Sequence, residues 1–232
     1  MDNNINTLII QFTNELSASE ITGFRGAVVA ALGGKDVDLL FHNHKEEGLR
    51  YSYPLIQYKR IHRRAAIVCI KQGVESIGDF FSNGKFDFTI RDKEYKMDIE
   101  CVRPTRTAVQ LWDTSFKYRI RKWLPLNSKN YAEFIKLEGI NERISFLEKI
   151  LIGNLLSFTK GVDIRLEQEL KCKLTSLSEP TIVRNKKVKL MSYDIEFMSN
   201  LSIPEFIGIG KNASVGYGII TKIRENNNIK TV

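Results

Sequence analysis

The spacing of hydrophobic residues predicts a strand followed by a helix at the start of the chain. Residues 5–12 form an apolar run of strand length. Ser17 and Glu20 have the spacing of a capping box, in which each side chain satisfies a free backbone amide at a helix start. Apolar residues then recur at helical spacing, and the glycine pair at 33–34 ends the predicted helix.

The next segments predict a hairpin and a second helix. Residues 51–60 form a predicted strand in which Pro54 favours an edge or a bulge, because proline has no amide to donate to a neighbouring strand. Residues 63–71 are its predicted hairpin partner, and residues 73–84 predict a short helix. One more strand within residues 86–99 would complete a ferredoxin-like βαββαβ unit.

A second series of strands and helices is predicted from about residue 95 onward. Residues 95–102 and 107–112 alternate as strands do, and the Arg-Pro-Thr segment at 103–105 predicts a turn between them. A long helix is predicted over residues 128–157, with an interruption near Gly139. Further strands follow it.

These patterns predict an α+β protein of two tandem ferredoxin-like (RRM-like, βαββαβ) domains. The expected N-terminal domain spans residues 1–95 and carries a histidine-bearing loop. The expected C-terminal domain spans residues 96–232 and carries a glycine-rich loop.

Composition and charge narrow the class of protein. Hydrophobic residues make up 43% of the 232 residues, which excludes a mostly disordered chain. Lys and Arg number 35 against 27 Asp and Glu, and the net charge of +8 favours an anionic partner such as nucleic acid. No apolar run approaches the roughly 18 residues of a membrane span, and the first ten residues lack the basic start of a secretory signal. Three widely spaced cysteines (Cys69, Cys101 and Cys172) are typical of a reduced, cytoplasmic protein and not of a disulfide or zinc framework.

A glycine-rich segment with the pattern G-x-G-x5-G-x-G lies near the C-terminus. Glycines let a backbone approach a ligand closely, so free amides and one amine are expected to meet phosphate oxygens here. The residues of this predicted contact are Gly208, Gly210, Lys211, Asn212, Ser214, Gly216 and Gly218. The spacing fits neither G-x-G-x-x-G nor a P-loop, which disfavours a nucleotide-binding enzyme. A glycine-rich hairpin that only turns the chain is the alternative interpretation.

With Ile209 and Tyr217 in its hydrophobic slots, the segment resembles the G-h-G-x5-G-h-G loop of the RAMP proteins of CRISPR systems. Length and two-domain layout further resemble the repeat-cleaving endoribonucleases of that superfamily, the sixth-numbered Cas family. The resemblance implies tandem ferredoxin-like domains and cleavage of precursor crRNA within its repeats, with no metal or other cofactor. Repeat RNA is the implied partner. Other Cas proteins and a second copy of the chain are further candidate partners, and no membrane is expected.

The resemblance also implies a catalytic histidine in or just after the first helix, where this chain has F-H-N-H at 41–44. Attack by the RNA 2′-OH needs a base, an acid and cations, and imidazole can serve as either base or acid near neutral pH. His42 and His44 are the candidates, with Lys45 or Lys59 expected to steady the phosphate. The implied products are a 2′,3′-cyclic phosphate (or 2′-phosphate) and a 5′-hydroxyl.

Other interpretations of the histidines stay open. Both could be ordinary solvated loop residues, and which of the two would be base or acid is not fixed by the sequence. A metal site at the H-x-H pair lacks a third ligand at recognisable spacing. His62, in a basic run, is more consistent with a phosphate or surface contact, and it is the reserve catalyst.

Basic clusters are the candidates for RNA affinity. In residues 116–126, side chains alternate between a basic face and an apolar face that includes Tyr118 and Ile120. A second cluster flanks the predicted hairpin turn, and a third surrounds residues 184–189. Arg25, in the first helix, faces either the catalytic loop or water. The predicted contacts are Arg25, Lys59, Arg60, Arg63, Arg64, Lys117, Arg119 and Arg121. Each cluster alone could be a solvated run of charge.

The leading hypothesis is therefore a CRISPR repeat endoribonuclease. The alternative is a non-catalytic RAMP subunit that holds crRNA as a scaffold in an effector complex, which would need no histidine pair. A general RNA-binding ferredoxin-like protein ranks last, because the chain lacks the aromatic RNP signature on a central strand.

Overall fold

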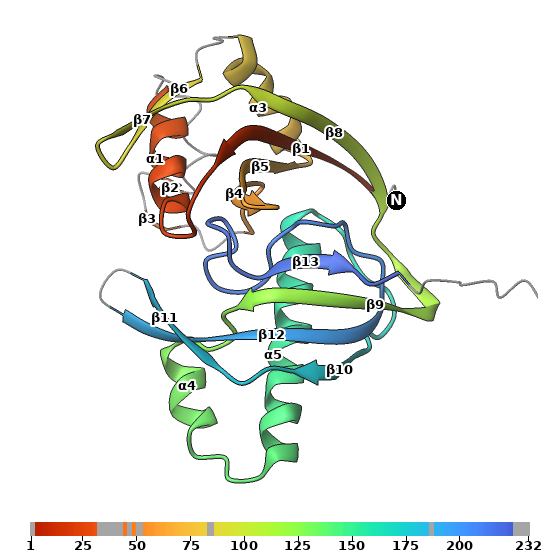
Figure 1. The fold of residues 1–232 in the computed structure, drawn as a ribbon. Helices are drawn as coiled ribbons and strands as arrows, with labels where there is room; N and C mark the ends of the chain where they lie inside the picture. The colour runs from red at the N-terminus through yellow and green to blue at the C-terminus, as the bar shows by residue number, and fades with distance from the viewer. Residues whose placement is uncertain are drawn as a thin grey trace, which may run out of the picture.

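The structure is a computed structural model that describes residues 3–31, 44–45, 48–49, 53–82, 86–185 and 188–224. Two β-sheets dominate it, one from each half of the chain (Figure 1). Within the described ranges, none of the helices is both long and apolar enough to cross a bilayer.

The first sheet is antiparallel throughout and has the order β4-β5-β1-β8. Its strands are β1 (Asn4–Glu15), β4 (Ile56–Ile61), β5 (Arg64–Ile70) and β8 (Ile99–Ala108), and its helices are α1 (Ile21–Ala31) and α3 (Gln72–Ser82). In chain order these elements are strand, helix, strand, strand, helix and strand, with the first strand in the centre. This is the predicted ferredoxin-like unit.

The last strand of this unit lies later in the chain than expected. Within residues 86–99, the expected place of this strand, β6 (Asp87–Ile90) and β7 (Lys93–Lys96) form a separate hairpin, and β6 packs against α1. The fourth strand of the sheet is instead β8, which pairs with β1 along nine registered positions. β8 lies beyond the boundary that we placed at residues 95 and 96, but it belongs to the first sheet.

The turn predicted at residues 103–105 is wrong. Pro104 lies inside β8 opposite Leu8 of β1, and the strand continues on both sides of it. β8 is an edge strand of the sheet, so its open side has no neighbouring strand. A proline is tolerated there, because no hydrogen bond to a neighbouring strand is lost on that side. Edge position therefore overrode the local turn preference.

The second sheet repeats the order of the first. Its strands are β9 (Leu111–Trp123), β10 (Cys172–Leu177), β11 (Thr181–Asn185), β12 (Val188–Leu201) and β13 (Ile219–Lys222). In the first half of the chain, β2 (His44–Lys45) and β3 (Gly48–Leu49) form a separate small hairpin. The order β10-β12-β9-β13 again has the first strand of the unit inside the sheet, with β11 paired to β12. A loop over residues 202–218, which contains the glycine-rich segment, replaces the second helix that would join β12 to β13.

The predicted helical interruption is confirmed. α4 (Ser128–Phe134) ends before Gly139, and α5 (Ile140–Gly161) begins directly after it. Asn127 caps α4: its side-chain oxygen accepts a hydrogen bond of 2.8 Å from the amide of Asn130. This satisfies a donor that the helix itself leaves free.

Two hydrophobic clusters lie on the two faces of the first sheet. One fills the space between one face of the first sheet and α1, with Phe12, Phe24 and Tyr58 at its centre. The other extends from the opposite face of that sheet to α5 and the second sheet, and includes Ile9 and Phe158. The first sheet is thus covered on both faces, and the second cluster joins the units through a shared core.

Candidate nucleic-acid interface

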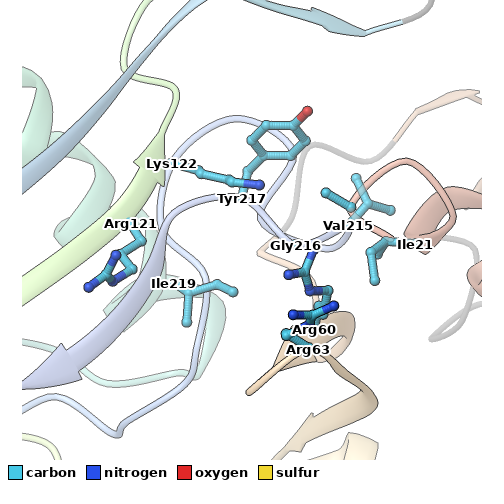
Figure 2. Close-up of a pocket in the computed structure, with 10 residues that line it drawn as sticks. Ile21, Arg60, Arg63, Arg121, Lys122, Val215, Gly216, Tyr217 and Ile219 are labelled. Carbon is cyan, nitrogen blue, oxygen red and sulfur yellow. The ribbon is translucent and has the colours of Figure 1, made fainter. Parts of the chain in front are cut away.

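A pocket of about 240 Å³ opens where segments of both units meet (Figure 2). Its walls come from the start of α1, the turn between β4 and β5, the end of β9 and the glycine-rich loop. The lining residues are Ala18, Ile21, Arg60, Arg63, Arg121, Lys122, Val215, Gly216, Tyr217 and Ile219. Four of these ten carry a positive charge and none carries a negative one, so the pocket favours an anion.

The turn between β4 and β5 projects Arg63 by an unusual backbone conformation. His62 and Arg63 form a two-residue hairpin turn with φ of 48° and 71°, a left-handed conformation that glycine or asparagine normally adopts. Side chains in this conformation are strained, and such strain tends to collect at functional sites. Arg63 also makes an exposed ion pair of 3.2 Å with Glu15.

A β-bulge brings Lys122 to the opposite wall. Between the pairs Tyr193–Trp123 and Ile195–Ile120, two residues of β9 stand opposite the single residue Asp194 of β12. Lys122 has φ of 52°, and its amide donates a hydrogen bond of 2.8 Å to the Asp194 carboxylate. Bulges redirect side chains in this way next to active sites.

The glycine-rich loop contributes less bare backbone to the pocket than the sequence suggested. A Cβ on Gly218 would lie 1.8 Å from the carbonyl oxygen of Ile209, and one on Gly210 would lie 2.9 Å from the Trp123 indole nitrogen. These glycines allow the loop to pack tightly on itself and on β9. Gly216 alone of the four glycines lines the pocket, and a Cβ there would meet only ordinary contacts of 3.6 Å or more.

The polar residues of the loop have different environments. Lys211 is exposed, and its amide donates to the carbonyl of Leu124. The carbonyl of Ser214 accepts a hydrogen bond of 2.8 Å from the amide of Tyr58 on β4. Asn212 has a left-handed φ of 59°, and its side-chain nitrogen is buried without a partner among the described residues. None of the three lines the pocket.

Of the predicted RNA-binding side chains, Arg60, Arg63 and Arg121 line the pocket. Arg64 pairs with Glu100 on β8, outside the pocket lining. Lys59 is fully buried, so the predicted phosphate contact is replaced by an internal one, with the carbonyl of Ala213.

The basic row of β9 faces acidic residues of β12. Lys117 and Arg119 both contact the Glu196 carboxylate, at 3.5 and 2.6 Å. The hydrogen bonds from Arg119 hold the pKa of Glu196 below its usual range. Tyr118 and Ile120 are buried on the other face, which confirms the predicted alternation of the strand.

Arg25 lies on α1 near the phenol of Tyr58. Burial raises the pKa of Tyr58 above its ordinary value, and the nearby Arg25 guanidinium partly offsets this effect. The helix position of Arg25 was expected, but its proximity to Tyr58 depends on how α1 packs on β4.

The candidate catalytic loop is described only in part. His42 lies outside the described residues, and the backbone of His44 and Lys45 forms β2, which pairs with β3. His62 is exposed at the β4–β5 turn, beside Arg63 of the pocket. Among the residues with described positions, no group of three or more His, Cys, Asp or Glu side chains is arranged to hold a metal ion.

Tandem ferredoxin-like units with a glycine-rich loop before the last strand define a RAMP protein of the Cas6 type. Within that class, the chain belongs to the Cas6b family: the Cas6b N-terminal domain matches residues 3–107, and the Cas6b C-terminal domain matches residues 110–223. The resemblance inferred from the sequence is thereby confirmed.

Two solved structures agree with this assignment. A crystal structure of Cas6b superimposes with a TM-score of 0.84 at 27% identity, covering 95% of this chain and 100% of the other. A second solved structure, named as the CRISPR RNA processing endoribonuclease Cas6b, has a TM-score of 0.73 at 26% identity with the same coverage. An uncharacterized protein of Methanocaldococcus jannaschii is 37% identical over 114 residues, which are 49% of this chain and 76% of that protein.

Proposed function

We propose that this protein cuts precursor crRNA within its repeats, by a metal-independent reaction in which the RNA 2′-OH is the nucleophile. Membership of the Cas6b family supports RNA cleavage, and a solved relative carries the name of a CRISPR RNA processing endoribonuclease. The observation that carries the proposal is the pocket itself. It joins four cationic side chains from both units to Gly216 and Tyr217 of the glycine-rich loop.

In the proposed reaction, one imidazole of His42 or His44 accepts the proton of the 2′-OH as that oxygen attacks the adjacent phosphorus. The bond from phosphorus to the 5′-oxygen breaks, and the other imidazole protonates the departing oxygen. The products are a 2′,3′-cyclic phosphate and a 5′-hydroxyl. Each proton transfer of this kind contributes roughly 10²–10⁴-fold to the rate.

The pocket residues have two roles in this proposal. Arg60, Arg63, Arg121 and Lys122 hold the phosphates on either side of the cut and stabilise the charge that develops during attack. The Tyr217 side chain points away from Arg60 and Arg63 (Figure 2). In this proposal its ring stacks on a splayed base while the arginines hold phosphates.

A cleavage assay with repeat RNA in EDTA tests the proposal. We expect cutting to persist in EDTA, to stop when the scissile 2′-OH is replaced by hydrogen, and to fall at least 100-fold in a His42→Ala/His44→Ala double variant. Lys129→Ala, at an exposed position of α4, is the matched surface control. Loss of cutting on chelation would contradict the metal-independent mechanism. Tight RNA binding without any cutting would instead indicate a RAMP scaffold.

A further inference from the structure

The glycine-rich loop is fastened to the first unit by buried polar side chains. Gln57, in β4, accepts a hydrogen bond of 2.7 Å from the amide of Gly208 through its side-chain oxygen. Its side-chain nitrogen donates to the Tyr53 hydroxyl at 2.9 Å, and that hydroxyl donates to the carbonyl of Gly208 at 2.9 Å. Both backbone groups of Gly208 are therefore held by side chains that lie about 150 residues earlier in the chain.

Lys59 makes a second attachment two residues further along the same strand. Its side chain is fully buried, and its amine lies 3.5 Å from the carbonyl oxygen of Ala213, within the loop. A Cβ on Gly208 would come within 2.8 Å of this amine, so the loop lies directly over it. Burial lowers the pKa of Lys59 to about 7. Burial of the amine disfavours its charged form and therefore costs free energy. An apolar side chain of similar length would not have this cost.

β4 also positions the pocket, through the hydrogen bonds of its free edge and through the side chain of Arg60 on its other face. The amide of Tyr58 donates to the carbonyl of Ser214, and Val215 runs parallel to Tyr58 as an added partner for edge strand β4. The residues that follow, Gly216 and Tyr217, line the pocket. Arg60 also lines it, from the strand position directly after Lys59. Because successive side chains of a strand point to opposite faces, β4 holds the loop with Gln57 and Lys59 and presents Arg60 beside it.

We propose that Gln57 and Lys59 are positioning residues for RNA cleavage, which fix the glycine-rich loop so that Gly216 and Tyr217 stand in register with Arg60 in the pocket. This inference rests on the proposed function, since it assigns these residues a role in the same reaction. They touch the loop and not the RNA. Their loss should therefore slow the cut within a bound complex more than it weakens RNA binding. A displacement of about 1 Å in such a site can reduce a rate by roughly 100-fold.

The test uses the full chain with Gln57→Leu and Lys59→Met, which remove the polar contacts and keep the approximate size of each side chain. Tyr58→Phe is the matched control: it lies between them in β4, and its hydroxyl is buried with no hydrogen-bond partner among the described residues. Tyr53→Phe removes only the hydroxyl that contacts Gly208 and keeps the ring packed on Phe158. It is the milder substitution if Gln57→Leu does not fold.

Three quantities are measured for each variant. The first is the single-turnover cleavage rate on repeat RNA. The second is the Kd for the same RNA with a 2′-deoxy group at the scissile position. The third is the hydrogen-exchange protection of residues 205–218, which does not depend on activity. We expect Gln57→Leu and Lys59→Met to cut 10–100-fold more slowly, with the Kd changed less than threefold and exchange in the loop at least tenfold faster. Tyr58→Phe should match the wild type in all three.

Wild-type rates and loop protection in folded Gln57→Leu and Lys59→Met proteins would overturn the inference. So would a loss that lies in the Kd alone. If the wild-type protein cuts no repeat RNA, the proposed function fails. Unchanged loop exchange in these variants would separately refute the anchoring role of Gln57 and Lys59.

Discussion

The carboxylate of Glu196 in β12 accepts two hydrogen bonds from the guanidinium of Arg119 in β9, at 3.1 and 2.6 Å. Lys117 contacts the same carboxylate, so one acidic residue stands opposite two basic ones. The row on β9 that the sequence marked as an RNA-binding face is therefore partly neutralised by its neighbouring strand. Of the pocket cations, Arg63 and Arg121 also have acidic partners, Glu15 and Asp194, whereas Arg60 has no ion-pair partner among the residues that the structure describes.

The first prediction concerns this acidic residue. Glu196→Gln should tighten binding of repeat RNA about two- to tenfold, because the substitution frees two cations and removes a negative charge from the surface. Fluorescence anisotropy with labelled uncleavable RNA measures the change. Arg119→Ala should weaken binding less than Arg60→Ala. An unchanged Kd in Glu196→Gln would mean that RNA does not approach this face.

The second prediction concerns the salt dependence of binding. Arg60→Ala should lower the slope of log affinity against log salt concentration by about 0.7, the contribution of one phosphate contact on a single strand. Titrations at four salt concentrations give the slope. Arg64→Ala is the matched control, because Arg64 follows the same turn but pairs with Glu100. Equal slopes for both variants would show that Arg60 makes no contact with phosphate.

The third prediction concerns glycine packing. Gly218→Ala should lower the free energy of unfolding by about 3 kcal/mol or more, since its Cβ would collide with the Ile209 carbonyl and its φ is +64°. Gly153→Ala in α5, where a Cβ meets nothing within 4 Å, should raise the free energy of unfolding by up to about 1 kcal/mol. Urea unfolding followed by circular dichroism compares the two. A tolerated Gly218→Ala would contradict the tight closure of the loop.

The fourth prediction concerns the pH dependence of stability. Burial lowers the pKa of Lys59 to about 7 in the folded protein, whereas an unfolded lysine keeps a value near 10.5. The unfolded state thus binds more protons between these values, so this residue makes the protein more stable as pH rises from about 7 toward 10. The slope is at most about 1.4 kcal/mol per pH unit. Lys59→Met lacks this titrating group. Any advantage in unfolding free energy that Lys59→Met has over the wild type at pH 7 should therefore shrink or reverse at pH 9. A constant difference would show that the amine titrates as if exposed.

Local patterns predicted most elements of the fold, because each pattern depends on residues near one another in sequence. One half of the predicted capping box is an example: the amide of Ser17 donates a hydrogen bond of 2.7 Å to Glu20, and α1 begins at Ile21. The other half is absent, because the Ser17 hydroxyl contacts the Ser19 hydroxyl and not the amide of Glu20. Alternation likewise identified the buried face of β9. Pro104 misled because its effect depends on whether the strand lies at the edge of a sheet, and strand order is a property of the whole chain.

The candidate site was predictable in its chemistry but not in its assembly. The sequence selected Arg60 and Arg121 as basic residues, but nothing local brings these two strands to one pocket. Lys59 next to Arg60 had the appearance of one more surface charge, and only the loop packed over it makes it an interior residue. Gln57 and Tyr53 were missed, since their partner Gly208 lies in the other half of the chain. The only sequence signal for Gln57 is that it lies two residues before Lys59 in a predicted strand, which places both side chains on the same face.

The loop over residues 202–218, which replaces a second helix, affects the order in which parts of the protein fold. A helix between β12 and β13 could form from its own hydrogen bonds, but residues 202–218 depend on partners such as Tyr53 and Gln57 in the first unit. Contacts between such distant residues form late, because a long stretch of chain must first be ordered. During translation, the first sheet can fold while the last strand is still inside the ribosome. The pocket, which Ile219 of β13 helps to line, is complete only after β13 has emerged, so an incomplete nascent chain has a folded first sheet and an unfinished pocket.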